Sequence, residues 1–101
     1  MRFRRDRFGE LVSRQLDLFA EDEAELLAEA EESERVYDAA DRDEAEELYG
    51  DFQLVLEAIA DGLETLCDTY AATLDDEVAG EYEEVFARAA RKRYPKLPSR
   101  F

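Results

Sequence analysis

One long amphipathic pattern dominates the chain: residues 42–73 read RDEAEELYGDFQLVLEAIADGLETLCDTYAAT. Apolar side chains recur at steps of three and four, which predicts a helix with one buried face. This stripe comprises Ala45, Leu48, Phe52, Val55, Ile59, Leu63, Leu66 and Tyr70, and Leu56 widens it. Gly50 and Gly62 each cost about 1 kcal/mol relative to Ala, but the stripe continues through both. We therefore predict one helix of about 48 Å; a kink at Asp61-Gly62 is the alternative.

A second apolar stripe precedes this helix and predicts another helix over about residues 6–40. It comprises Phe8, Leu11, Val12, Leu18, Phe19, Leu26, Ala30, Tyr37 and Ala40, with Gln15, Asp22 and Ser33 at further core-facing positions. Asp22 followed by Glu25 matches the D-x-x-E form of a helix start. The segment is therefore either one rod, with or without a bend, or two pieces that meet near Glu21. We favour the single rod.

A third, shorter helix is predicted over about residues 76–94. Acidic residues at 75–77 suit its first turn, and Arg91, Lys92 and Arg93 suit its last turn, because the helix dipole favours this arrangement of charge. Pro95 ends the helix. Residues 95–101 then form an extended basic tail after a single helical domain, residues 1–94.

The expected fold is all-α: an antiparallel hairpin of long helices with a shorter third helix, forming a three-helix bundle. A third helix of 19 residues spans about 28 Å, which is too short to cover a hairpin of about 48 Å. A second copy of the chain is the commonest cover for such an apolar face. We therefore expect a homodimer built on the first two helices.

Charge is strongly segregated along the 101 residues, whose net charge is −15. Residues 1–7 carry four Arg and one Asp, residues 8–87 carry 27 acids and three Arg, and residues 88–101 carry six cations and no acid. The nets are +3, −24 and +6. No apolar run follows the basic N-terminus or approaches the length of a membrane span, so we expect a cytoplasmic protein that does not contact membranes.

Catalytic chemistry finds little support, since the chain has no His and a single Cys. Cys67 lies beside the main stripe and is interpreted as a small core residue. The acidic pairs Glu29/Glu32, Glu44/Glu47 and Glu81/Glu84 have metal-ligand spacing, but no His completes a site, so a solvated face is favoured. We assign no catalytic, cofactor-binding or metal-binding residue, and expect a protein that is not an enzyme and needs no cofactor.

The best candidate contact surface is the basic C-terminal cluster: Arg88, Arg91, Lys92, Arg93, Lys96 and Arg100. Cations beside Tyr94 are typical of a nucleic-acid contact. The favoured interpretation is structural, with the cations complementing the helix dipole and the chain's own acidic body. That body would repel a phosphate backbone over a Debye length of about 10 Å.

These features favour a non-enzymatic helical interaction or structural protein that acts through self-association and an acidic helical surface, with a protein partner. One alternative is a nucleic-acid-associated protein that binds through residues 88–101. The other is a helical bundle that binds a metal through carboxylates.

Overall fold

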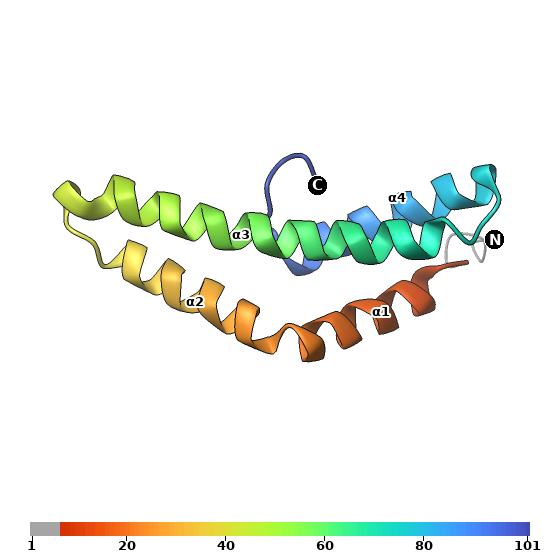
Figure 1. Ribbon diagram of the computed structural model, residues 1–101, viewed down its shortest axis with the longest axis horizontal. Coiled ribbons are helices and arrows are strands. Elements are labelled where there is room, and N and C mark those ends of the chain that lie inside the picture. Colours follow the sequence, from red (N-terminus) through yellow and green to blue (C-terminus); the bar gives the residue numbers. More distant parts are fainter. Residues whose placement is uncertain (1–6) are drawn as a thin grey trace.

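The computed structural model describes residues 7–101, and in this range the chain folds into four helices with no strand. The helices are α1 (Gly9–Asp22), α2 (Ala24–Asp38), α3 (Arg42–Ala71) and α4 (Asp76–Arg93). Figure 1 shows α1 and α2 as a shallow arch that runs antiparallel to α3, while α4 lies along the C-terminal half of α3. The described part measures 52 × 26 × 22 Å. The expected all-α class is correct; residue 6, the expected helix start, lies outside the described residues.

The central helix, α3, is continuous through Gly50 and Gly62. Its buried residues are Phe52, Leu56, Ile59, Ala60, Leu63, Cys67 and Ala71. After Ala71 the chain turns, and the hydroxyl of Thr73 donates a hydrogen bond to the carbonyl of Tyr70 (2.7 Å). The periodic stripe therefore specifies one helix, and the alternative kink at Asp61-Gly62 does not occur.

The prediction of one rod over residues 6–40 is wrong, because the helix breaks at Glu23 (φ −109°, ψ 32°). The break lies among Glu21, Asp22, Glu23 and Glu25, where like charges repel along a continuous helix. Asp22 is exposed, and its side chain caps neither helix. The bend lets α1 pack against α4 while α2 packs against α3. Tertiary packing thus selects the two-piece alternative.

Fully buried side chains concentrate at the end of the molecule where three helices meet. The largest are Leu16 and Val12 of α1, Leu63 of α3, and Tyr82 and Phe86 of α4. Gly62 lets α1 approach α3 closely, because a Cβ at this position would lie 3.1 Å from the ring of Phe19. This end therefore holds the core of the fold.

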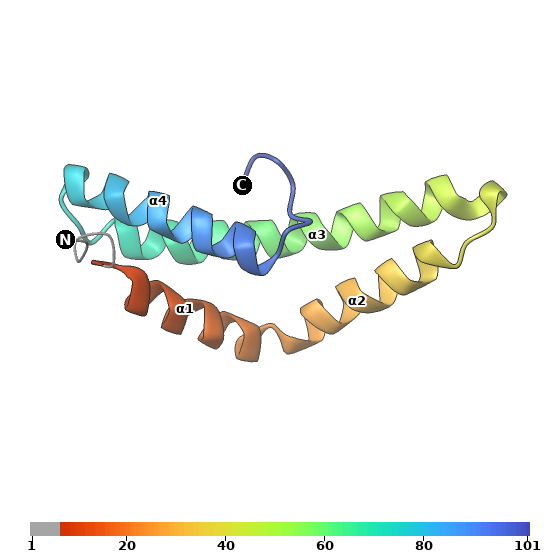
Figure 2. The same ribbon diagram turned by 180° about the vertical axis from the view of Figure 1, so that it is seen from behind.

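The other end is a two-helix arm, residues 24–56, made of α2 and the N-terminal half of α3. None of the residues of α2, all of which are described, is buried. Helix α4 has 18 residues, which corresponds to about 27 Å, and it does not reach this arm in either view (Figures 1 and 2). The bundle therefore has three helices at one end and two at the other.

The tail after α4 is not extended as expected. The amide of Leu97 donates to the carbonyl of Tyr94, and that of Phe101 donates to the carbonyl of Pro98. Leu97 is only 7% exposed, and the ring of Phe101 lies 6.3 Å from that of Phe86. Burial of Leu97 and partial burial of Phe101 hold the tail folded back over the helices, as Figure 2 shows.

Candidate partner-binding groove

An open apolar groove runs along the two-helix arm between α2 and α3. Its apolar side is formed by Ala30, Phe52, Leu56 and Ile59, and Glu31, Glu34 and Asp38 of α2 form its acidic wall. Tyr37 and Tyr49, with ring centroids 5.2 Å apart, lie at its outer end. The inner part alone has a volume of about 300 Å³. We call this feature the arm groove.

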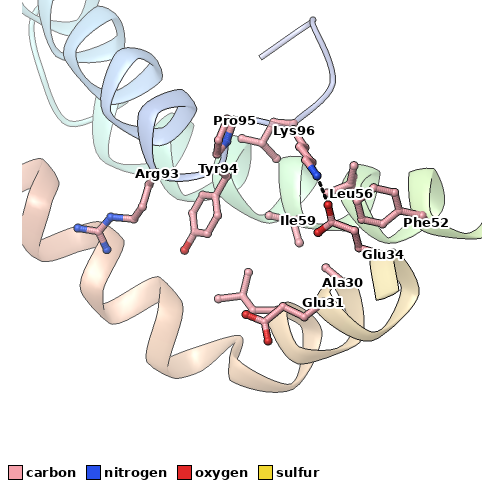
Figure 3. A pocket seen from close by; sticks show the side chains of 12 residues that line it. Ala30, Glu31, Glu34, Phe52, Leu56, Ile59, Arg93, Tyr94, Pro95 and Lys96 are labelled. Atoms are coloured by element: carbon pink, nitrogen blue, oxygen red, sulfur yellow. Dashed lines mark hydrogen bonds and ion pairs between the residues drawn. The ribbon is translucent and has the colours of Figure 1, made fainter. Parts of the chain in front are cut away.

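The inner end of the arm groove is closed by residues 94–97, which directly follow α4 (Figure 3). Helix α4 packs against α1 and α3 at the three-helix end. The arm groove therefore begins where α4 stops, and it extends the trough that α4 fills along α3. A helix laid in the groove would extend the third layer of the bundle.

Negative charge dominates the arm around this groove. Residues 24–56 contain twelve Asp and Glu against two Arg, a net of −10. On the acidic wall, Lys96 reaches over from the tail and pairs with Glu34, as Figure 3 shows. Among residues 7–101, no cation pairs with Glu31 or Asp38. The groove thus combines an apolar strip with carboxylates along one side.

The six cations of the predicted contact cluster divide into two groups. Arg93 pairs with Asp17 (2.9 Å), and Lys96 pairs with Glu34. Arg100 is also paired, as described below, whereas Arg88, Arg91 and Lys92 are exposed on the last turns of α4, and within residues 7–101 none of these three pairs with a carboxylate. The cluster is therefore not one continuous surface.

Arg100 is bound by three carboxylates of α3. Its guanidinium nitrogens lie 2.9 Å from Glu57, 2.8 Å from Asp61 and 2.7 Å from Glu64. The hydrogen bonds that Arg100 donates to Glu57, Glu64 and Asp61 raise its pKa above the ordinary value. Three of the six cations, Arg93, Lys96 and Arg100, therefore bind the acidic body of their own chain.

The thiol of Cys67 is buried in the core. Burial, together with the charges of Asp68, Glu83 and Glu64, raises its pKa to about 11. A thiol with a raised pKa is a weak nucleophile near neutral pH because little thiolate forms. Its position agrees with the interpretation of Cys67 as a core residue.

The acidic pairs do not converge on a common point. Glu29, Glu32, Glu44, Glu47 and Glu84 are all exposed, and Glu81 pairs with Arg7 at 3.3 Å. In residues 7–101 no group of three or more Asp, Glu, Cys or His side chains is arranged to hold a metal ion. The pairs thus share sequence spacing without sharing a site.

The arm groove itself was missed by sequence reasoning, which identified only the length mismatch between the helices. Within residues 7–101 no helix is both long and apolar enough to cross a membrane. Comparison of the chain with protein-family models, curated proteins and solved structures finds no match. The groove and the charges around it are therefore the basis for a functional proposal.

Proposed function

We propose that the protein is a non-enzymatic helical interaction protein, which binds a cationic amphipathic helix of a partner protein in its arm groove. The observation that carries this proposal is the missing third layer of the arm. Between α2 and α3, beyond the end of α4, an open groove has Phe52 and Leu56 at its floor, each of them 6% exposed. Apolar grooves between helices are common receptors for amphipathic helices.

The dimensions of the groove suit a short helix. From Tyr49 to Ile59, α3 advances ten residues, or about 15 Å. At the three-helix end, Tyr82, Phe86 and Ala90 of α4 are buried at successive steps of four residues. A partner helix with apolar residues at the same spacing would bury them against Phe52 and Leu56.

The charge of the groove favours a cationic occupant. Glu31, Glu34 and Asp38 follow one another at steps of three and four residues, so they lie along one side of α2. A helix with Lys or Arg at the same steps, flanking its apolar stripe, would pair with this wall. Attraction of this kind also raises the rate of association.

A second copy of the chain is a poorer occupant of this groove. Two arms packed face to face would bring together two regions of net charge −10 each. The homodimer expected from the sequence therefore stands as the competing proposal. Light scattering at tens of micromolar tests it: a dimer that tightens with salt, and tightens further in the groove-wall variant described below, would replace the partner helix by a second copy.

Binding through the basic C-terminus is a weaker alternative than the groove. Pairing of Arg93, Lys96 and Arg100 within the chain leaves Arg88, Arg91 and Lys92 for a phosphate backbone. Three contacts would give a weak interaction with only a shallow salt dependence, opposed by the acidic body. The acidic arm offers more unpaired charge than the basic end does.

The proposal is tested with a fluorescein-labelled peptide of Leu and Lys, about fourteen residues long, with its leucines at helical spacing. A scrambled peptide of the same composition is the first control. Fluorescence anisotropy should show binding of the amphipathic peptide and much weaker binding of the scrambled one. Equal binding of the two peptides would show simple charge attraction and would refute a helix-binding groove.

The second control separates the groove wall from the general charge of the arm. The variant Glu31→Gln/Glu34→Gln/Asp38→Asn should weaken peptide binding about tenfold, at roughly 0.5 kcal/mol for each exposed pair. The variant Glu25→Gln/Glu29→Gln/Glu32→Gln removes the same charge from exposed positions of α2 outside the arm groove. Its effect should be less than about twofold. Equal losses in both variants would contradict binding in the groove.

A further inference from the structure

The C-terminal segment has the chemistry that the groove is proposed to recognise. Residues 94–101 read YPKLPSRF, in which a cation and an apolar residue stand together twice. At the first position Lys96 pairs with Glu34 while Leu97 is buried. At the second, Arg100 binds three carboxylates and Phe101 lies against Phe86. The acidic body of the molecule thus already holds one cationic, apolar segment, which is its own.

This segment lies at the inner end of the arm groove. Tyr94 and Pro95 close the trough, and Lys96 extends from the tail to the acidic wall of α2 (Figure 3). Glu34 is the middle carboxylate of that wall, so its pairing with Lys96 divides the wall. A partner helix that pairs with the whole wall must therefore displace the side chain of Lys96.

The attachment of the tail is of a kind that a partner can reverse. The side chains of Lys96 and Arg100 are 62% and 36% exposed, and exposed ion pairs contribute little and weaken with salt. Within residues 7–101, the backbone amides of Leu97 and Phe101 bond only inside the tail. Within the described residues the tail is therefore held by ion pairs and by the apolar contacts of Tyr94, Leu97 and Phe101, and its backbone bonds to a helix only through the Tyr94 amide, which donates to Ala90 at the end of α4.

We infer that the segment Tyr94–Phe101 is an intramolecular competitor for the arm groove, which a cationic partner helix displaces by taking Glu34 from Lys96. Binding then couples to release of the tail, and a change that loosens the tail without altering the groove wall strengthens binding. The inference rests on the proposed function for the identity of the ligand. The position of the tail can be measured independently of any ligand.

Arg100 offers a clean test, because its partners Glu57, Asp61 and Glu64 do not line the arm groove. The variant Arg100→Gln loosens the tail and leaves the groove wall intact. The variant Arg91→Gln is its matched control: it removes the same charge from an exposed position that, within residues 7–101, forms no ion pair. The probe is the amphipathic Leu–Lys peptide, measured by anisotropy against wild type and both variants.

A spin label at Ser99→Cys, in a Cys67→Ala background, reports the tail itself. We expect an immobile label in the free protein, and a mobile label on addition of the peptide or in the Arg100→Gln variant. Peptide binding should tighten about threefold to tenfold in Arg100→Gln, and less than about twofold in Arg91→Gln. Circular dichroism of each variant checks that the helices persist.

The outcomes separate the two proposals. The proposal that the tail competes for the groove would be overturned, with the proposed function intact, by either of two results. In the first, the peptide binds wild type while the label stays immobile. In the second, Arg100→Gln and Arg91→Gln bind the peptide with equal affinity. Binding of the peptide by the Arg100→Gln variant but not by wild type or Arg91→Gln would mean that the attached tail blocks the groove completely. Absence of binding by every form would overturn both, and a label that is mobile in the free protein would overturn the competitor alone.

Discussion

Gln15 stands on the apolar stripe of α1, and its side-chain oxygen accepts a hydrogen bond from the hydroxyl of Tyr82 in α4 (2.7 Å). Tyr82 is completely buried, whereas Gln15 is partly exposed. The two residues can therefore be perturbed one at a time with unequal consequences. Replacing Tyr82 by Phe leaves the amide of Gln15 within reach of water. Replacing Gln15 by Leu leaves the Tyr82 hydroxyl inside the core without this acceptor.

The burial of Tyr82 and the partial exposure of Gln15 determine how much each substitution should lower the free energy of unfolding. A hydrogen bond contributes about 0.5–1.5 kcal/mol net, and a buried polar group without a partner costs about 1–3 kcal/mol. We expect Tyr82→Phe to lower the free energy of unfolding by about 1 kcal/mol, and Gln15→Leu by about 2 kcal/mol. The double variant removes both polar groups, so its cost should fall short of the sum by about 1 kcal/mol or more.

Urea unfolding followed by far-ultraviolet circular dichroism measures each of these free energies. Tyr49→Phe and Gln53→Leu form a control cycle on the arm, since no hydrogen bond joins those two side chains within residues 7–101. That cycle should be additive within about 0.5 kcal/mol. The reasoning would be refuted if the free-energy changes of the Gln15–Tyr82 cycle were additive as well. It would also be refuted if Tyr82→Phe lowered the free energy of unfolding more than Gln15→Leu does.

Three further predictions concern stability. Gly50→Ala should stabilise the protein by about 1 kcal/mol in urea unfolding, because among residues 7–101 nothing lies within 4 Å of its added Cβ; Gly62→Ala should gain less, because its Cβ meets Phe19 at 3.1 Å, and an equal gain would contradict that contact. Burial raises the pKa of Cys67 from 9.0 to about 11 and that of Tyr82 from 10.0 to about 12, so the fold favours their neutral forms. The stability that these two groups contribute is complete below pH 9, and urea midpoints should fall as it is lost between pH 9 and pH 12. Moderate salt should raise the melting temperature, because a net charge of −15 repels itself; an unchanged or falling value would show that ion pairs outweigh the repulsion.

The sequence predicts α3 and α4 well because their signals are local. An unbroken stripe defines α3, and acids, cations and Pro95 mark the ends of α4. For the break at Glu23, the sequence offers only Asp22 as a signal. That signal is ambiguous, because the residues of a helix start and those of a charged turn within a continuous helix look alike in sequence. The choice is made by packing: α1 has α4 as a neighbour, and that information lies more than fifty residues away.

The pairing of the basic C-terminal cluster could be predicted only in part, for a similar reason. Complementation of the chain's own acidic body was the favoured interpretation, and Arg93, Lys96 and Arg100 pair in this way. Which carboxylates they meet could not be foreseen, because Glu57 and Asp61 lie about forty residues from Arg100. The spacing of Glu57, Asp61 and Glu64 already placed them on one side of α3, but a similar spacing recurs throughout an acidic chain.

The division of the molecule into a three-helix end and a two-helix arm separates folding from the proposed binding. At the three-helix end, Leu63, Tyr82 and Phe86 are fully enclosed, so substitutions there act on the stability of the whole domain. The carboxylates of the acidic wall belong to α2, all of whose residues are described and none of which is buried, so neutral substitutions there remove charge without opening a cavity. Glutamine variants of this wall should therefore keep or raise the melting temperature, because they relieve repulsion in a region of net charge −10. The negative charge that opposes folding of the arm is the same charge that a cationic helix would neutralise. These variants should therefore weaken peptide binding without lowering stability.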